Sequence, residues 1–155
     1  TSGGEREASL IVDSQLRELA RVNAWVHDWA ERQHLPPKVV HRLDLCSTEV
    51  VTNIVNHAAS AGAQLISLHL GWQGEAVALE VEDDGERFDP RAHPAPAPAT
   101  SLRDAHVGGW GIPIVRHFSD GLRWRHEDGR NHLTLLFRAN APARPATPTP
   151  STTEE

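Results

Sequence analysis

The feature that most constrains the fold is a run of apolar residues at helical spacing between positions 39 and 55. They recur every three or four positions: Val39, Val40, Leu43, Cys46, Val50, Val51, Ile54 and Val55. This pattern predicts an amphipathic helix whose apolar face packs against a second layer. In the same helix, Glu49, Asn53 and His57 follow one another at intervals of four, so they form a polar stripe along one flank. The stripe either faces solvent or lines a pocket for a polar ligand, because a buried polar group without a partner costs about 1–3 kcal/mol.

The segments around this helix predict a sheet. Residues 8–12 have the composition of a strand, and residues 14–32 have helical period up to a proline break at 35–38. Alternating apolar residues then predict two hairpins with glycine-containing turns, the first turn at Gln73 and Gly74 and the second within "DGRN". Their strands are expected at 64–72 with 75–83, and at 121–128 with 131–137. This order favours an α+β fold, a two-layer sandwich with helices on one face of a mixed, mainly antiparallel sheet.

The expected domain spans residues 8–138, because a chain of 155 residues suits one domain. Residues 1–7 and the tail 139–155, which is rich in Pro, Ala and Thr, are expected to be disordered, since such segments cannot bury apolar surface. The single cysteine, Cys46, excludes an internal disulfide framework.

Charge and hydropathy narrow the choice of partners. A formal net charge of -6 without a basic cluster argues against nucleic acid or anionic lipid as the main partner. No apolar run approaches the roughly 18 residues of a membrane-spanning helix, and no signal peptide is present. A cytoplasmic protein, with no membrane and no direct nucleic-acid partner, is therefore expected.

Two stretches outside the long helix carry residue types suited to a ligand. Asp83 and Asp84 end a predicted strand and are followed by Gly85, which lets a backbone come close to a ligand or simply makes a tight acidic turn. Glycines 108, 109 and 111 stand directly before a predicted helix, where backbone N–H groups can face phosphate oxygens. The glycines do not fit the P-loop pattern, which also requires a lysine.

Together and in this order, the stretches resemble the N, G1 and G2 boxes of the GHKL ATPase superfamily, most of all the RsbW-type anti-sigma-factor serine kinases. "EVVTNIVNHA" is similar to the N box, "VEDDGERFDP" to the G1 box and "GGWGIPIVRHFSD" to the G2 box, while "EDGRNHLTLLF" resembles the closing hairpin. The resemblance spans roughly residues 8–138. It implies the Bergerat fold of that superfamily, with ATP and Mg²⁺ as cofactors.

The resemblance also implies roles for individual residues. Asn53 would bind the magnesium that bridges the ATP phosphates, and Glu49 would be the general base or its orienting carboxylate. His57 would line the pocket. Asp83, two residues before the G1 glycine Gly85, would accept a hydrogen bond from the adenine amino group.

The remaining roles concern the phosphates and the closing hairpin. The resemblance implies that Gly108, Gly109 and Gly111 let the segment 90–107 close over the phosphates as a mobile lid. Thr134, on the closing strand, would help the adenine contact. The chain departs from the family pattern at Arg87, where the wider superfamily has a second G1 glycine, and at Val107, where related kinases can carry a basic residue.

Two functions follow from this resemblance. The first is an ATP-dependent serine/threonine kinase that sequesters a sigma factor and phosphorylates an anti-sigma-factor antagonist protein. The alternative is a nucleotide-binding regulatory module with little or no transfer activity. The catalytic domain of a histidine kinase is disfavoured because no phosphoacceptor His followed by Glu precedes the N box, and a gyrase-like machine is excluded by length. Whether the chain forms a homodimer, as related switch kinases do, stays open.

Overall fold

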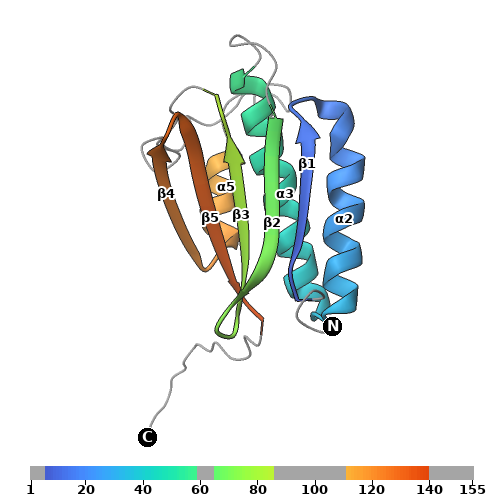
Figure 1. Ribbon diagram of the computed structural model, residues 1–155. Coiled ribbons are helices and arrows are strands. Elements are labelled where there is room, and N and C mark those ends of the chain that lie inside the picture. Colours follow the sequence, from blue (N-terminus) through green and yellow to red (C-terminus); the bar gives the residue numbers. More distant parts are fainter. Residues whose placement is uncertain (1–5, 59–64, 86–110, 140–155) are drawn as a thin grey trace, which may run out of the picture.

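The computed structural model describes residues 6–58, 65–85 and 111–139. One sheet lies against a layer of three helices, so the fold is a two-layer α+β sandwich (Figure 1). The strands are β1 (Ala8–Asp13), β2 (Leu65–Gln73), β3 (Ala76–Asp83), β4 (Gly121–Glu127) and β5 (Arg130–Arg138). Their order is β1-β2-β3-β5-β4, and every neighbouring pair is antiparallel. The predicted α+β sandwich with helices on one face is confirmed, and among the described strands the sheet has no parallel pair.

Both hairpin turns use two residues. Gly74 and Glu75 join β2 to β3, with Gly74 at φ 63°, a conformation that favours glycine. The sequence placed this turn one residue early, since Gln73 still pairs with Ala76. Asp128 and Gly129 join β4 to β5 with φ of 56° and 75°, the two positive values of a type I′ turn.

The helical layer contains α2 (Leu19–Arg32), α3 (Pro37–Ala58) and α5 (Gly111–Phe118). A short 3₁₀ helix, η1 (Leu16–Glu18), precedes α2 in the segment predicted as one helix from residue 14. The long helix α3 begins at a proline, whose missing N–H costs nothing in a first turn. It lies between α2 and α5 and contacts both (Figure 1).

Alternate residues of each strand face the helices. In β3, Val77, Leu79 and Val81 are buried, whereas Glu80 between them is exposed. The core between the layers is built from such residues and from the apolar face of α3. Its largest fully buried side chains are Trp29, Leu43, Ile66, Leu68, Leu70, Leu79, Leu135 and Phe137.

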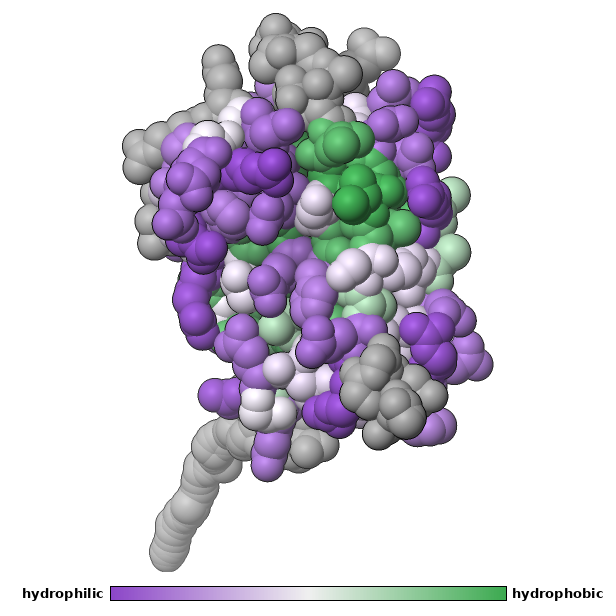
Figure 2. All heavy atoms as spheres, viewed as in Figure 1, coloured by the Kyte–Doolittle hydropathy of each residue, from purple (hydrophilic) through white to green (hydrophobic). Residues whose placement is uncertain are grey.

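The other face of the sheet is not covered by helices. It is mostly hydrophilic, apart from a hydrophobic area over the end of β1 and the beginning of β2 (Figure 2). Ile11 and Leu65 lie there, with exposed fractions of 57% and 54%. A residue before β1 also contacts this sheet: the carboxylate of Glu7 lies 3.1 Å from Nε2 of His69. The segments 1–5 and 140–155 lie outside the described residues, so their expected disorder stays a prediction.

Candidate functional site

The centre of the candidate site is Asp83, the last residue of β3. Its side chain is buried, with 8% exposed, on the face of the sheet that the helices cover. Oδ1 accepts hydrogen bonds from the backbone N–H of Gly85 at 2.9 Å and from Nδ2 of Asn131 at 3.2 Å. Among the described residues, both hydrogen bonds to this carboxylate therefore end at the same oxygen.

The surroundings of Asp83 shift the pKa of its carboxyl group. Burial raises the pKa of Asp83 above its ordinary value, and the charge of Asp84 adds to the rise. The hydrogen bonds from Gly85 and Asn131 and the charge of His126 act in the opposite direction and lower this pKa. Burial is the largest of these causes, so the protein holds a carboxylate where the charged form is costly.

Gly85 leaves room for the carboxylate of Asp83. A Cβ added at this position would lie 3.0 Å from Oδ1 of Asp83, tighter than most Cβ contacts. Because the backbone N–H of Gly85 also donates to that oxygen, a larger residue would shift the carboxylate by a few tenths of an ångström. The glycine thus serves the geometry of Asp83, which accounts for its place in the motif.

The polar stripe of α3 lies on the flank that faces away from α2. The α2 side is marked by Asn23, whose Nδ2 donates to Oδ1 of Asp44 at 2.7 Å and to Oγ1 of Thr48 at 2.9 Å. Asn53 follows Asp44 by nine residues, a rotation of about 180° around the helix axis at 3.6 residues per turn. Asn53 therefore points to the α5 side, and Glu49, one turn earlier, lies on the same flank.

Glu49 and Asn53 are half-buried, whereas His57 is exposed. Burial raises the pKa of the Cys46 thiol to about 12, and the negative charge of Glu49 is the second cause of that rise. Glu49 thus lies at the border between the core and the flank that faces α5.

The third part of the site is the beginning of α5. Gly111 is its first residue, and the buried side chains of Ile112 and Val115 anchor the helix in the core. Gly108 and Gly109, like the predicted lid 90–107, lie outside the described residues. The predicted phosphate contacts of these glycines stay a prediction.

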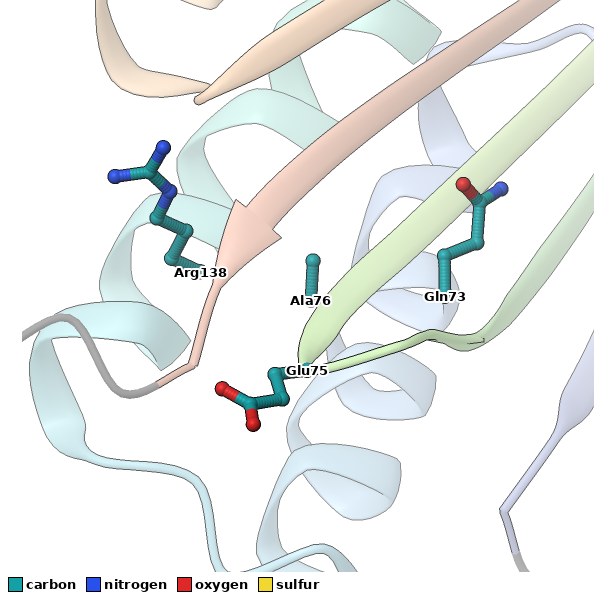
Figure 3. Close-up of a pocket in the computed structure, with 4 residues that line it drawn as sticks. All are labelled: Gln73, Glu75, Ala76 and Arg138. Atoms are coloured by element: carbon teal, nitrogen blue, oxygen red, sulfur yellow. The ribbon is translucent and has the colours of Figure 1, made fainter.

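These parts lie at one end of the molecule. The end of β3, the beginning of β5, the C-terminal half of α3 and the beginning of α5 point to the upper end in Figure 1. A different hollow, about 260 Å³ in volume, lies at the opposite end beside the β2–β3 turn (Figure 3). It is lined by Gln73, Glu75, Ala76 and Arg138 and includes no residue that the sequence predicts for the ligand site.

Thr134 lies on the other face of the sheet from Asp83. It pairs with Glu80 across β3 and β5, and that pair lies on the face without helices. Because side chains alternate along a strand, Thr134 points away from Asp83, so the expected adenine contact from this residue is not supported. The pairing instead places Asn131 directly opposite Asp83.

Asn131 is the site residue that the sequence interpretation missed. The apolar alternation of Leu133, Leu135 and Phe137 extends back to position 131, so a polar residue stands where the pattern expects an apolar one. That interruption was the available signal. Its meaning depends on which residue of β3 lies opposite, and the sequence alone does not give this pairing.

The family model of the histidine kinase-like ATPase domain matches residues 12–137 of this chain. The chain belongs to the histidine kinase-like ATPase family. The match includes the stripe on α3, Asp83, α5 and the closing hairpin, so the resemblance read from the sequence boxes is confirmed.

Several known proteins are similar to the chain. The serine/threonine-protein kinase BtrW of Bordetella bronchiseptica is 38% identical over 112 residues, 72% of this chain and 79% of BtrW. The RsbU and RsbW domains of Rv1364c from Mycobacterium tuberculosis share the fold with a TM-score of 0.63 and 20% identity over 92% of this chain. This chain spans only 34% of the chain in that structure. The SiaB-SiaC complex of Pseudomonas aeruginosa contains a chain with a TM-score of 0.54 and 13% identity, covering 87% of this chain and 92% of that one.

The histidine kinase-like ATPase fold implies a nucleotide and Mg²⁺, and the donor set fits both. Within residues 6–58, 65–85 and 111–139, no three His, Cys, Asp or Glu side chains come together to enclose a metal ion. A single amide oxygen, from Asn53, suits Mg²⁺, which is usually held by one or two protein ligands together with waters and substrate phosphates. No helix in the described part of the chain is long and apolar enough to cross a membrane.

Proposed function

We propose that this chain is an ATP-binding serine/threonine protein kinase that acts as an anti-sigma factor in the cytoplasm. It phosphorylates an anti-sigma-factor antagonist protein and thereby controls the release of a sigma factor. The observation that carries the proposal is the buried carboxylate of Asp83, held by Gly85 and Asn131 in a chain of the histidine kinase-like ATPase family. Its relative BtrW is named as a serine/threonine-protein kinase.

Asp83 selects adenine over guanine. An ionised carboxylate only accepts hydrogen bonds, and adenine offers an exocyclic amine where guanine offers a carbonyl oxygen. With Oδ1 held by two donors, the second oxygen is the acceptor for that amine. Guanine would place two acceptors against each other, which a buried site tolerates poorly.

Asn53 and Glu49 supply the chemistry at the phosphates. Asn53 would hold Mg²⁺, which when bound screens the charge of the β- and γ-phosphates. Glu49 orients a serine or threonine hydroxyl of the substrate protein and accepts its proton. The hydroxyl oxygen forms a bond to the γ-phosphorus, the bond to the bridging oxygen breaks, and ADP leaves.

The fold relatives support a protein substrate. One is an RsbW domain beside an RsbU domain, and another belongs to the SiaB-SiaC complex. A protein of one compact domain with its site at one end is suited to receive a small antagonist there. The sigma factor would bind elsewhere on the same domain.

A nucleotide-binding module without transfer activity is the second candidate. It is favoured by Val107, which stands where related kinases can carry a basic residue near the phosphates, and by Arg87 in place of a glycine. Such a module would still bind ATP at Asp83, but it would change its affinity for a partner instead of modifying it.

The test is phosphate transfer to antagonist proteins encoded near the gene for this chain. The full chain is incubated with Mg²⁺-ATP and each candidate, and intact-mass spectrometry records whether the antagonist gains one phosphate. The proposal expects phosphorylation at a single Ser or Thr, lost when that residue is replaced by Ala. A chain that binds ATP but modifies none of the candidates would overturn the kinase assignment in favour of the binding module.

A further inference from the structure

Three polar side chains line up across three neighbouring strands behind the adenine site. His126 of β4 pairs with Asn131 of β5, and Asn131 pairs with Asp83 of β3. The Nδ1 atom of His126 lies 3.3 Å from Oδ1 of Asn131, and Nδ2 of Asn131 lies 3.2 Å from Oδ1 of Asp83. The three residues therefore form one continuous hydrogen-bonded row on the helix-covered face of the sheet.

The row has only one consistent direction when Asp83 is ionised. A carboxylate cannot donate, so Asn131 must present its NH₂ group to Asp83. Its carbonyl oxygen then faces Nδ1 of His126, and this contact is a hydrogen bond only when Nδ1 carries a hydrogen. Nδ1 carries that hydrogen in the charged imidazolium and in one of the two neutral tautomers.

We infer that His126 is a positioning residue for adenine selection, which acts by holding the amide of Asn131 with its NH₂ group toward Asp83. This inference rests on the proposed binding of adenine nucleotides at Asp83. His126 does not touch the nucleotide in this account. It fixes the orientation of a side chain that in turn fixes the carboxylate.

The physical reason is that an asparagine amide is nearly symmetric in shape but not in hydrogen bonding. Without a donor at position 126, the amide of Asn131 loses one of the contacts that favour its NH₂ group toward Asp83. The hydrogen bond that lowers the pKa of Asp83 would then be weakened. A protonated Asp83 can donate to the carbonyl oxygen of guanine, so discrimination between the bases weakens.

Two substitutions of similar shape at position 126 distinguish the loss of a hydrogen-bond donor from a change in side-chain volume. His126→Asn keeps an N–H near the position of Nδ1, whereas His126→Leu has the same branched shape without a donor. His132→Asn is the matched control, because His132 neighbours Arg125 in the same strand pair but lies on the opposite face, with Nδ1 3.2 Å from Glu82.

Calorimetric titration of each full-length variant with Mg²⁺-ATP and Mg²⁺-GTP gives the first readout. His126→Leu should weaken ATP by about threefold to tenfold and reduce the ATP-to-GTP preference, the effect of one lost hydrogen bond. His126→Asn and His132→Asn should stay within about twofold of the parent, a change too small to reflect a lost hydrogen bond. If the parent binds ATP and the Leu and Asn variants at position 126 bind it equally well, the positioning role is overturned and the proposed function stands.

The second readout needs no nucleotide. Imidazole ¹⁵N–¹H correlation spectra of the parent report which ring nitrogen of His126 carries hydrogen, with the signal assigned by its loss in His126→Asn. A hydrogen on Nδ1 supports the inference, and a neutral ring with hydrogen only on Nε2 overturns it, even if His126→Leu fails to fold. A folded parent that binds no adenine nucleotide would overturn the proposed function and this role together.

Discussion

Asn131 donates from Nδ2 to Oδ1 of Asp83 at 3.2 Å, and the two residues are direct partners across β3 and β5. Both side chains are buried on the face that the helices cover. The carboxylate of the candidate adenine site is thus set by strand pairing together with the backbone N–H of Gly85 in the turn after β3. Burial raises the pKa of Asp83, and the hydrogen bond from Asn131 acts against that rise.

The first prediction compares Asn131 with Thr134. Asn131→Ala removes a donor to the buried carboxylate, so ATP affinity should fall by about tenfold, the loss of a hydrogen bond to a charged group. Thr134→Ala should leave ATP affinity unchanged, because Thr134 lies on the opposite face of the sheet. Fluorescence competition with a labelled ADP would measure both. A larger loss in Thr134→Ala than in Asn131→Ala would contradict this placement of the site.

The second prediction concerns the pH dependence of stability. Because the pKa of Asp83 is raised in the folded chain, the native state binds this proton more readily than the unfolded state does. Its contribution to stability is present below the unfolded pKa and is lost as pH rises through the folded pKa. At neutral pH, Asp83→Asn should therefore melt a few degrees above the parent, since the amide carries no charge to bury.

Thermal melts between mildly acidic and neutral pH check this prediction. The advantage of Asp83→Asn should shrink as pH falls through the raised pKa of Asp83. Asp84→Asn is the control, because Asp84 is exposed and its neutralisation should change the profile less. If the parent is more stable than Asp83→Asn at neutral pH, by a margin that does not change with pH, the prediction is contradicted.

The third prediction separates catalysis from binding on α3. Glu49→Gln keeps the shape of the side chain but removes its charge, so transfer to the antagonist should slow by about 10²–10⁴-fold while ATP still binds. Asn53→Ala should weaken Mg²⁺-ATP as well as transfer, because it removes a ligand to the metal. Glu80→Gln, exposed on the other face, is the control. Rates come from phosphate incorporation and affinities from calorimetry; full transfer by Glu49→Gln would remove Glu49 from the reaction.

Most of the fold could be predicted because its elements are marked by local signals. The period of α3, the proline at its start and the alternation of β3 all act within one element. The Asp128–Gly129 turn was recognisable because few residue pairs take two positive φ values. The order of the strands carries no such signal, since β5 inserts between β3 and β4 through contacts distant in sequence.

Site residues could be predicted where a sequence motif identifies them, but not where strand pairing decides which residue lies beside Asp83. Asp83 stands at a recognisable strand end before Gly85, and the structure gives it a buried place with two donors. The sequence interpretation named Thr134, but residues three apart on a strand lie on opposite faces, so Asn131 and not Thr134 shares the face of Asp83. Which of them meets Asp83 depends on the register of β5 against β3.

The most direct test of the central claim is the titration of the parent chain with ATP, ADP and GTP in the presence of Mg²⁺. Our account predicts that both adenine nucleotides bind at one site per chain and that GTP binds at least about tenfold more weakly, since a buried acceptor rejects a base that lacks the matching donor. A folded sample that takes up no adenine nucleotide at millimolar concentration, or that binds GTP as tightly as ATP, would contradict it.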